Sequence, residues 1–428
     1  MLRTALLVAL AAAVPAQAQD GPDFSSVTAL LQDSLPQFGG GEFLLRQDGR
    51  ELYRASFAGW DSTRAVPIAS ASKWLSGTVL MSLVADGTLS LDDTVGDWLP
   101  DAPADKRAVT LRQLFAHTSG LPSLQIGGCL DDRTTTLAAC AQSILDGPLL
   151  SAPGEAFRYG GLSMQVGGYL AEVASGQPFN TLFAERIAAP LGLTRTDFGP
   201  GDNPRVAGGA SSTAAEYARV VEMLLDGGAP ALTPAAVDSM LADQTRGAEI
   251  VYSPYQSLAE ALGDPALAET RYGVGVWRER VDPATGAVLE AASQGAFGFS
   301  PWIDRPNGVV AVLAVQDDLP ALYPTYLELK ARVGEALASA TAIAAGPPSA
   351  PALSVWPNPA RHRLAVAVAG WAPQSLCLVD AVGRDAACAD VRGPSPYPVA
   401  LSGLAPGLYL VRAQSDGRTQ TRPVVVVR

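Results

Sequence analysis

The order of apolar and polar residues divides the chain into two regions of different character. Up to residue 343, strand-like segments occur near both ends and helical patterns occupy the middle, whereas after residue 352 only short alternating strands recur. Between them, the stretch 344–352 is rich in Ala and Pro, a composition typical of a linker. The sequence therefore predicts an α+β domain over 19–343, a linker over 344–352 and a small all-β sandwich over 353–428.

The first region is expected to contain an antiparallel sheet flanked by helices, with a helical subdomain beside the sheet. A turn at Asp48-Gly49 separates two strands near its start, and further strands follow near its end, so strands from both ends meet in one sheet. The expected strands are 43–46, 51–56, 272–281, 287–299 and 308–316. The expected helices are 75–85, 164–174, 180–187, 213–225 and 326–338.

The chain opens with the pattern of an export signal. A basic start is followed by an apolar run from Leu6 to Val14 and by small residues before position 19, which is typical of a cleaved signal peptide over residues 1–18. No later run reaches the ~18 apolar residues that a membrane-spanning helix needs, so the mature chain is not expected to be an integral membrane protein. The net charge of −12 argues against a nucleic-acid partner.

Four cysteines form two pairs that are local in sequence, which in an exported chain predicts two local disulfides. Cys129 and Cys140 flank a loop that leads into a helix. Cys377 and Cys388 would meet across a hairpin, although the simplest pairing of its strands leaves the two positions one residue out of register. The sequence therefore does not decide whether the second disulfide forms.

A serine and a lysine one helical turn apart are the strongest candidates for chemistry. Ser70 and Lys73 precede an apolar run typical of a buried helix, and Lys73 is one of three lysines among 30 basic residues. A desolvated lysine can accept a proton from a serine, which the permanently charged guanidinium of an arginine cannot do. Burial and the positive end of the helix dipole are expected to lower the pKa of Lys73. This pair indicates a serine nucleophile that works without histidine.

Chemistry based on histidine or on a metal is disfavoured, because the chain has two histidines, His117 and His362. No Gly-x-Ser-x-Gly sequence of the kind that carries the nucleophile of an α/β-hydrolase is present. His117 lies in a turn-rich stretch and is interpreted as a side chain that staples a loop rather than as a base. A catalytic zinc site takes about three protein ligands, and these positions are too few and too scattered, so no metal or other cofactor is expected.

Further motifs accompany the serine–lysine pair in a fixed order along residues 25–340. They are Ile68-Ala-Ser-Ala-Ser-Lys73, Ala85-Asp-Gly-Thr-Leu-Ser-Leu-Asp-Asp93, Leu111-Arg-Gln-Leu-Phe-Ala-His-Thr-Ser-Gly-Leu-Pro122, Pro153-Gly154, Tyr159, Pro190-Leu-Gly-Leu193 and Gly208-Gly209. Together they resemble the penicillin-binding, serine β-lactamase-like superfamily, and most closely its branch of class C β-lactamases, D-stereospecific peptidases and related esterases. The resemblance implies the β-lactamase/transpeptidase-like fold for the first region.

The resemblance also implies a role for each motif residue. Ser70 would be the nucleophile, Lys73 its partner, and Tyr159 a second proton-handling group on the opposite wall of the cleft. Lys73 and Tyr159 are expected to titrate as a pair in which each lowers the pKa of the other, and either could take the first proton. The backbone N–H groups of Ser70 and Ala296 would form the oxyanion hole. The implied chemistry is acyl transfer to Ser70 followed by hydrolysis.

Two motifs depart from the family pattern. The usual Tyr-x-Asn is Tyr159-Gly160-Gly161 here, and the usual Lys/His-x-Gly aligns with Ser293-Gln294-Gly295, so an amide and a cation are missing. Gly161, Ser293 and Gly295 are still the expected substrate-binding positions. β-Lactams and peptidoglycan stems carry a carboxylate near the scissile carbonyl, so the missing cation favours neutral esters, unless an arginine elsewhere in the cleft restores the anion site.

The final region resembles the C-terminal sorting domain of type IX secretion cargo. Val355-Trp-Pro-Asn-Pro359 opens it, and strands are expected at 364–368, 375–379, 404–411 and 423–428. The resemblance implies the secretion machinery as a partner, passage across the outer membrane, and a secreted or cell-surface location. A carbohydrate-binding or spacer module would show similar strand spacing.

The sequence as a whole predicts an exported serine hydrolase that acts on a small acyl substrate, with esters favoured over β-lactams and D-peptides. Two alternatives belong to other classes of protein. One is a catalytically silent binding protein on the same scaffold, and the other is a surface adhesin. Covalent labelling of Ser70 by an acylating reagent distinguishes the hydrolase from both.

Overall fold

The structure is a computed structural model that describes residues 21–123, 128–345 and 353–427, apart from 357, 369–370, 381–382, 394 and 416–417. The chain divides into two compact units, Met1–Leu337 and Ala338–Arg428. The expected signal peptide (1–18) and residues 346–352 of the expected linker lie outside the described residues. Within the described ranges, no helix is long and apolar enough to cross a membrane.

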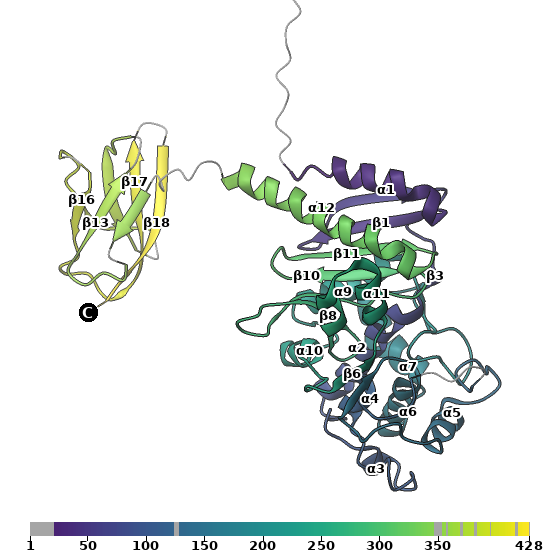
Figure 1. The fold of residues 1–428 in the computed structure, drawn as a ribbon. Helices are drawn as coiled ribbons and strands as arrows, with labels where there is room; N and C mark the ends of the chain where they lie inside the picture. Colours follow the sequence, from purple (N-terminus) through teal and green to yellow (C-terminus); the bar gives the residue numbers. More distant parts are fainter. Residues whose placement is uncertain are drawn as a thin grey trace, which may run out of the picture. The chain divides into compact units, whose positions relative to one another are not determined.

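An antiparallel sheet of seven strands forms the centre of the first unit (Figure 1). Its order is β2-β1-β11-β10-β9-β8-β7, so the N-terminal hairpin lies beside strands from the end of the unit. This confirms that strands from both ends of the region share one antiparallel sheet. The strands are β1 (Gly41–Gln47), β2 (Arg50–Phe57), β7 (Arg271–Tyr272), β8 (Trp277–Val281), β9 (Val288–Ala292), β10 (Ser300–Asp304) and β11 (Val309–Val315).

Helices and short strand pairs surround this sheet. The helices are α1 (Ser25–Phe38), α2 (Ser72–Ala85), α3 (Val95–Trp98), α4 (Leu111–Phe115), α5 (Leu137–Leu145), α6 (Leu162–Ser175), α7 (Phe179–Phe183), α8 (Ala189–Leu191), α9 (Ala214–Leu225), α10 (Pro234–Leu241), α11 (Pro254–Leu262) and α12 (Leu319–Ala345). The structure also has two 3-10 helices, η1 (Ala69–Ala71) and η3 (Pro265–Glu269), and one π-helical segment among the described residues, η2 (Ala184–Ala188). The remaining strands pair as β3 (Val66–Pro67) with β5 (Ser211–Ser212), and β4 (Ala156–Arg158) with β6 (Glu249–Tyr252).

The alternation of side chains along the central strands separates two hydrophobic layers. Phe43 and Leu45 of β1 pack with α1 and α12 on one face of the sheet. Leu44, which lies between them in the sequence, packs with α2 and α9 on the other face. Figure 1 shows the N-terminal and C-terminal helices of the unit together on one side of the sheet. The middle of the chain covers the opposite face, where α2 is buried from Ser72 to Leu83.

Two expected strands differ from the structure. The expected strand 272–281 is split into β7 and β8 by residues 273–276, where Gly275 has a φ of +75°. The expected strand 287–299 ends at Ala292, and the next strand, β10, is a separate element that the sequence pattern does not reveal. Residues 293–299 therefore form a connection instead of a strand. The expected helices are present, and α12 is longer than expected at both ends.

The second unit is a sandwich of two antiparallel sheets, β12-β13-β16 and β15-β14-β17-β18. Leu364, Val366, Leu376, Leu378 and Val411, from both sheets, belong to one apolar core. The all-β prediction is confirmed. The strands are β12 (Leu353–Trp356), β13 (Arg363–Val368), β14 (Ser375–Val379), β15 (Asp385–Cys388), β16 (Tyr397–Ala400), β17 (Gly407–Ser415) and β18 (Arg418–Val426).

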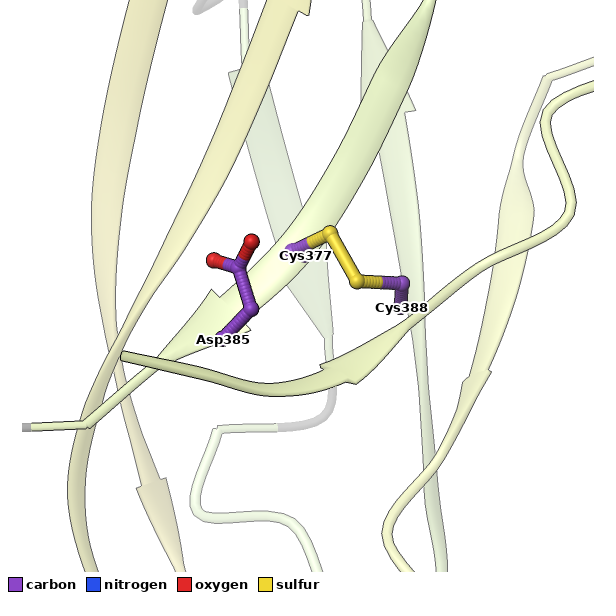
Figure 2. A group of neighbouring side chains, drawn as sticks. All are labelled: Cys377, Asp385 and Cys388. Carbon is purple, nitrogen blue, oxygen red and sulfur yellow. A yellow bond between two sulfur atoms is a disulfide. The ribbon is translucent and has the colours of Figure 1, made fainter. Parts of the chain in front are cut away.

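Both cysteine pairs are bonded in the structure, including the second pair, whose bond the sequence did not decide. Cys129 and Cys140 are bonded, with their Cα atoms 5.2 Å apart. Cys377 and Cys388 are bonded across β14 and β15, where they lie directly opposite each other (Figure 2). A bulge after Leu378 takes up the one-residue offset that simple strand pairing leaves.

A chain that ends at Ala345 should fold without the sandwich, since each unit has its own hydrophobic core. We expect its thermal unfolding midpoint to lie within about 3 °C of the matching transition in the full chain. Calorimetry of the two purified chains measures the difference. Loss of a cooperative transition in the shortened chain would mean that the first unit depends on the sandwich.

Candidate active site

Ser70 and Lys73 lie at the start of the buried helix α2. Ser70 belongs to the short turn η1, and Lys73 lies in the first turn of α2. Their spacing of three residues turns both side chains to the same face, and Lys73 Nζ lies 3.0 Å from Ser70 Oγ. Lys73 Nζ also donates a 2.8 Å hydrogen bond to the carbonyl oxygen of Ala207. This second contact orients the amine toward the serine hydroxyl.

The environment of Lys73 disfavours its charged form. The residue is 3% exposed. Burial and, to a smaller extent, the positive charge of Arg205 lower the pKa of Lys73 from 10.5 to about 7. The lowered pKa predicted from desolvation is therefore present, and near neutral pH a substantial fraction of the molecules carries an uncharged amine beside Ser70.

Two glycines allow the sheet to approach the backbone that carries this pair. A Cβ added at Gly275 would lie 2.1 Å from the carbonyl oxygen of Lys73, and one added at Gly295 would lie 2.1 Å from that of Ile68. No side chain fits at such distances without a shift of the backbone. The break between β7 and β8 and the early end of β9 therefore hold the sheet directly against the segment that carries Ser70.

Tyr159 forms another wall of the same cleft. It follows β4, and its backbone N–H donates a 2.9 Å hydrogen bond to the carbonyl oxygen of Tyr252 at the end of β6. Tyr159 and Ser70 both line this cleft. The Tyr159 ring centre lies 4.6 Å from Lys73 Nζ. The structure thus brings together the three predicted catalytic residues from two distant parts of the sequence.

Tyr159 does not have the lowered pKa that the sequence suggested. Burial raises the pKa of Tyr159 to about 12, although hydrogen bonds with Ser70 and Trp277 act in the opposite direction. The expectation that Lys73 would lower this pKa is wrong, because the cost of desolvating the phenolate is larger than the favourable contacts. Tyr159 is therefore protonated at neutral pH, and Lys73 is the better proton acceptor of the two.

An aromatic cluster holds the ring of Tyr159 in place. Trp277 stacks on it with ring centroids 4.9 Å apart, and the rings of His117 and Tyr272 lie at 4.8 and 5.9 Å. His117 is buried, its Nδ1 lies 3.4 Å from Ser163 Oγ, and burial lowers its pKa well below the usual value. In the structure His117 packs against the Tyr159 ring, and its interpretation as a loop-stapling side chain stays a prediction. The local sequence does not reveal that His117 contacts Tyr159.

The predicted oxyanion and substrate positions have different surroundings. Ser70, Ala296 and Gly161 line the cleft. Ser293 is buried, and its hydroxyl lies 3.4 Å from the carbonyl oxygens of Ser70 and Gly275. The Ser293 side chain therefore bonds to the backbone that supports the nucleophile, and its expected contact with substrate stays a prediction.

The other two expected substrate positions are limited by close neighbours. A Cβ at Gly161 would lie 3.1 Å from Leu130 Cδ1, so Leu130 occupies the space next to the position where the family has an amide. Gly295 packs on the backbone of Ile68, and it is Ala296 that lines the cleft. Gly295 therefore acts through the close approach of the two backbones.

Three residues that sequence reasoning missed line this cleft, which has a volume of about 260 Å³. Arg205 comes from the loop between α8 and β5, Tyr252 from the end of β6, and Phe297 from the connection between β9 and β10. Tyr252 and Phe297 are 46% and 49% exposed. None of the three belongs to a periodic pattern or a motif, so only the tertiary structure shows that they border the site.

One group of three candidate metal ligands occurs in the described part of the chain, Cys377, Asp385 and Cys388 (Figure 2). The two sulfur atoms are bonded to each other, and Arg412 donates a 2.6 Å hydrogen bond to the Asp385 carboxylate. These groups are already engaged, so the cluster gives no support for a metal centre.

The fold and this constellation agree with comparison to known families. Residues 27–333 match the beta-lactamase family, and residues 354–427 match the secretion system C-terminal sorting domain. The chain belongs to the beta-lactamase family, whose members include hydrolases of esters, amides and peptides, and it carries a C-terminal sorting domain.

Individual relatives differ in the substrates that their names give. The chain is 28% identical over 297 residues to esterase EstB of Burkholderia gladioli, covering 58% of this chain and 76% of EstB. It is 30% identical over 142 residues to the D-alanyl-D-alanine-carboxypeptidase/endopeptidase AmpH of Escherichia coli strain K12, covering 32% of this chain and 37% of AmpH. A crystal structure assigned as a beta-lactamase from Bacteroides dorei DSM 17855 has a TM-score of 0.65 and 32% identity, covering 72% of this chain and 99% of that one. Membership of the family therefore leaves the substrate class open.

Gly295→Ala should disturb the segment that carries Ser70, because the added methyl group would overlap the Ile68 carbonyl oxygen. We expect the free energy of unfolding to fall by about 1–3 kcal/mol, as is usual for overpacking. Gly334→Ala on α12 is the control, since nothing lies within 4 Å of its added carbon. Urea denaturation measures both variants. Equal stability of the two would contradict the close approach of Gly295 to Ile68.

Proposed function

We propose that this chain is an exported ester hydrolase in which Ser70 forms an acyl-enzyme. The observation that carries the proposal is a buried lysine amine 3.0 Å from a serine hydroxyl, with its pKa lowered to about 7. A base with this pKa is well suited to remove a proton at neutral pH. The intact pair, with Tyr159 beside it, supports catalysis over a silent binding protein or an adhesin on the same scaffold.

In the acylation step, neutral Lys73 accepts the proton of the Ser70 hydroxyl while Oγ attacks the ester carbonyl carbon. The hydrogen bond from Nζ to the Ala207 carbonyl directs the amine lone pair toward Oγ. The carbonyl oxygen becomes an oxyanion, which accepts hydrogen bonds from the backbone N–H groups of Ser70 and Ala296. The first proton transfer is therefore from Ser70 to Lys73 and not to Tyr159.

Tyr159 is suited to the next proton transfer. Its raised pKa keeps it protonated, so it gives its proton to the departing alkoxide and recovers one from Lys73 as the bond to the alcohol breaks. Water then attacks the acyl carbon, the carboxylic acid leaves, and Ser70 regains its proton. Lys73 and Tyr159 thus hold complementary roles because burial shifts their pKa values apart.

Two observations support esters over β-lactams as substrates. The aligned position of the usual cation holds the buried Ser293, so a carboxylate near the scissile carbonyl gains no charge-assisted hydrogen bond there, a contact worth about 1.5–3 kcal/mol. The similarity to esterase EstB, which covers 76% of that enzyme, points the same way. A small ester needs no anion contact at this position.

Export through the type IX machinery is the second part of the proposal. The match of residues 354–427 to a C-terminal sorting domain supports it. The sandwich is also a compact unit with its own core, as expected for a domain that the secretion machinery recognises. We infer that the enzyme acts outside the cell or at its surface.

The rate of ester hydrolysis should rise with pH as Lys73 loses its proton. Only the neutral amine accepts a proton, so kcat/KM should increase about tenfold per pH unit well below 7 and level off above about pH 8. Lys73→Arg should lower kcat/KM roughly a hundredfold or more and abolish this rise, because a guanidinium keeps its charge. Lys106→Arg makes the same exchange at a lysine paired with Asp105 and should keep nearly full activity. Wild-type-like activity in Lys73→Arg would overturn the role of the amine.

Hydrolysis of a short-chain 4-nitrophenyl ester should exceed that of a chromogenic cephalosporin. We expect a ratio of kcat/KM values of roughly ten or more in favour of the ester, the scale of the missing hydrogen bond. The Ser70→Ala variant gives the background rate for both reactions. A larger kcat/KM for the cephalosporin would replace the esterase assignment by a β-lactamase.

A further inference from the structure

A second hollow, of about 390 Å³, adjoins the cleft at Ser70. Arg205 and Gly208 line both the cleft and this hollow, so the two spaces share a wall. A Cβ added at Gly208 would lie 3.6 Å from Arg205 Nε and 3.9 Å from the carbonyl carbon of Ala69. The guanidinium group and the residue before the nucleophile therefore flank the same glycine. The proposed chemistry at Ser70 makes no use of this hollow.

The backbone that carries Arg205 is firmly held. Its carbonyl oxygen accepts hydrogen bonds of 3.0 and 2.7 Å from the N–H groups of Gly208 and Gly209. Gln165 of the buried helix α6 donates 2.9 Å hydrogen bonds to Asn203 and to the carbonyl oxygen of Pro204. A backbone fixed in this way loses little freedom when a ligand binds to the side chain that it carries, which favours recognition.

The facing loop is also anchored. Asn203 Nδ2 donates hydrogen bonds of 2.8 and 2.9 Å to the carbonyl oxygens of Cys129 and Asp132. The disulfide from Cys129 to Cys140 closes the same loop. The side chains of Asp131 and Arg133, which also line the hollow, therefore extend from a backbone that is tied to the Arg205 loop.

The charges that line the hollow favour an anion. They are Arg205, Arg133 and Asp131, two guanidinium groups against one carboxylate, on a chain whose net charge is −12. Arg205 Nη1 lies 3.1 Å from Asp131 Oδ1, and these two side chains are 46% and 59% exposed. Exposed ion pairs of this kind contribute little stability, so a ligand carboxylate can compete with Asp131. An arginine guanidinium offers five N–H donors in a geometry that matches a carboxylate.

Other segments at the cleft are apolar. Tyr252, Pro254 and Phe297 line it, and both aromatic rings are about half exposed. An ester whose carbonyl lies at Ser70 can thus place an apolar alcohol group on these residues and extend its acyl chain toward Arg205. The cleft offers one apolar and one cationic contact to the two ends of a single substrate.

We propose that the preferred substrate is the half-ester of a short dicarboxylic acid, whose free carboxylate binds Arg205 and Arg133. This proposal rests on the proposed ester hydrolysis at Ser70. It supplies, from another part of the chain, the anion contact that Ser293 does not provide. Because the arginines lie in the adjoining hollow, the carboxylate belongs at the far end of the acyl chain and not next to the scissile carbonyl.

The test compares two esters of similar acyl length, 4-nitrophenyl hydrogen glutarate and 4-nitrophenyl butyrate. We expect the ratio of their kcat/KM values, glutarate to butyrate, to be roughly ten or more in the wild type. Arg205→Gln should lower this ratio roughly ten- to a hundredfold, and Arg133→Gln should lower it less. The ratio cancels the effect of Arg205 on the pKa of Lys73, which both esters share. Asp131→Asn should raise the ratio, since it removes the competing carboxylate.

Arg332→Gln is the control, because Arg332 is paired with Glu328 on α12 and does not line either space. It should keep the wild-type ratio, and the ratio in the wild type should fall as salt is added. An unchanged ratio in Arg205→Gln, or equal rates for the two esters in the wild type, would overturn the anion subsite.

A binding measurement separates this subsite from the proposed function. Calorimetric titration of the Ser70→Ala chain with monomethyl glutarate should show binding that Arg205→Gln weakens at least tenfold. If the wild type hydrolyses neither ester while this binding is present, the ester hydrolysis is wrong and the subsite stands. If no Arg205-dependent binding occurs, the subsite is wrong whatever the esterase activity.

Discussion

The burial of the Lys73 amine is the interaction on which the rest of the site depends. Among the described residues, its polar contacts are with Ser70 Oγ and the Ala207 carbonyl oxygen, and the ring of Tyr159 lies beside it. Without a carboxylate in contact to stabilise the ammonium form, burial lowers the pKa to about 7. A lysine in water would be protonated near pH 7 and could not act as a base. The fold has to keep water away from one amine while leaving a serine hydroxyl within its reach.

The sheet and the helical region meet this requirement together. Helix α2 is buried along most of its length, and the sheet approaches its first turn closely at Gly275 and the preceding residue Ile68 closely at Gly295. The ring of Tyr159 covers another side of the Lys73 amine, and an aromatic cluster holds that ring in place. The same burial that lowers the pKa of Lys73 raises that of Tyr159, so one physical effect separates a base from an acid.

Local features of the sequence were sufficient for part of this picture. The pairing of Ser70 with Lys73 follows from one turn of helix, and the strand-like patterns near both ends of the region predicted the shared antiparallel sheet. The raised pKa of Tyr159, the buried position of Ser293 and the place of Arg205 depend on contacts between distant segments. These contacts leave no periodic signal. The pattern also merged β9 with the connection that follows it, in which Gly295 approaches Ile68 from a distant part of the chain.

Formation of a covalent adduct on Ser70 is the most direct measurement of the central claim. The purified chain is incubated with a fluorophosphonate at several pH values, and intact-protein mass spectrometry with peptide mapping follows the rate and the position of the adduct. A serine activated by a buried amine should carry the adduct at Ser70, at a rate that rises with pH through a midpoint near the Lys73 pKa of about 7. An unmodified Ser70, or a rate that does not change across neutral pH, would contradict the claim that the buried amine activates the serine.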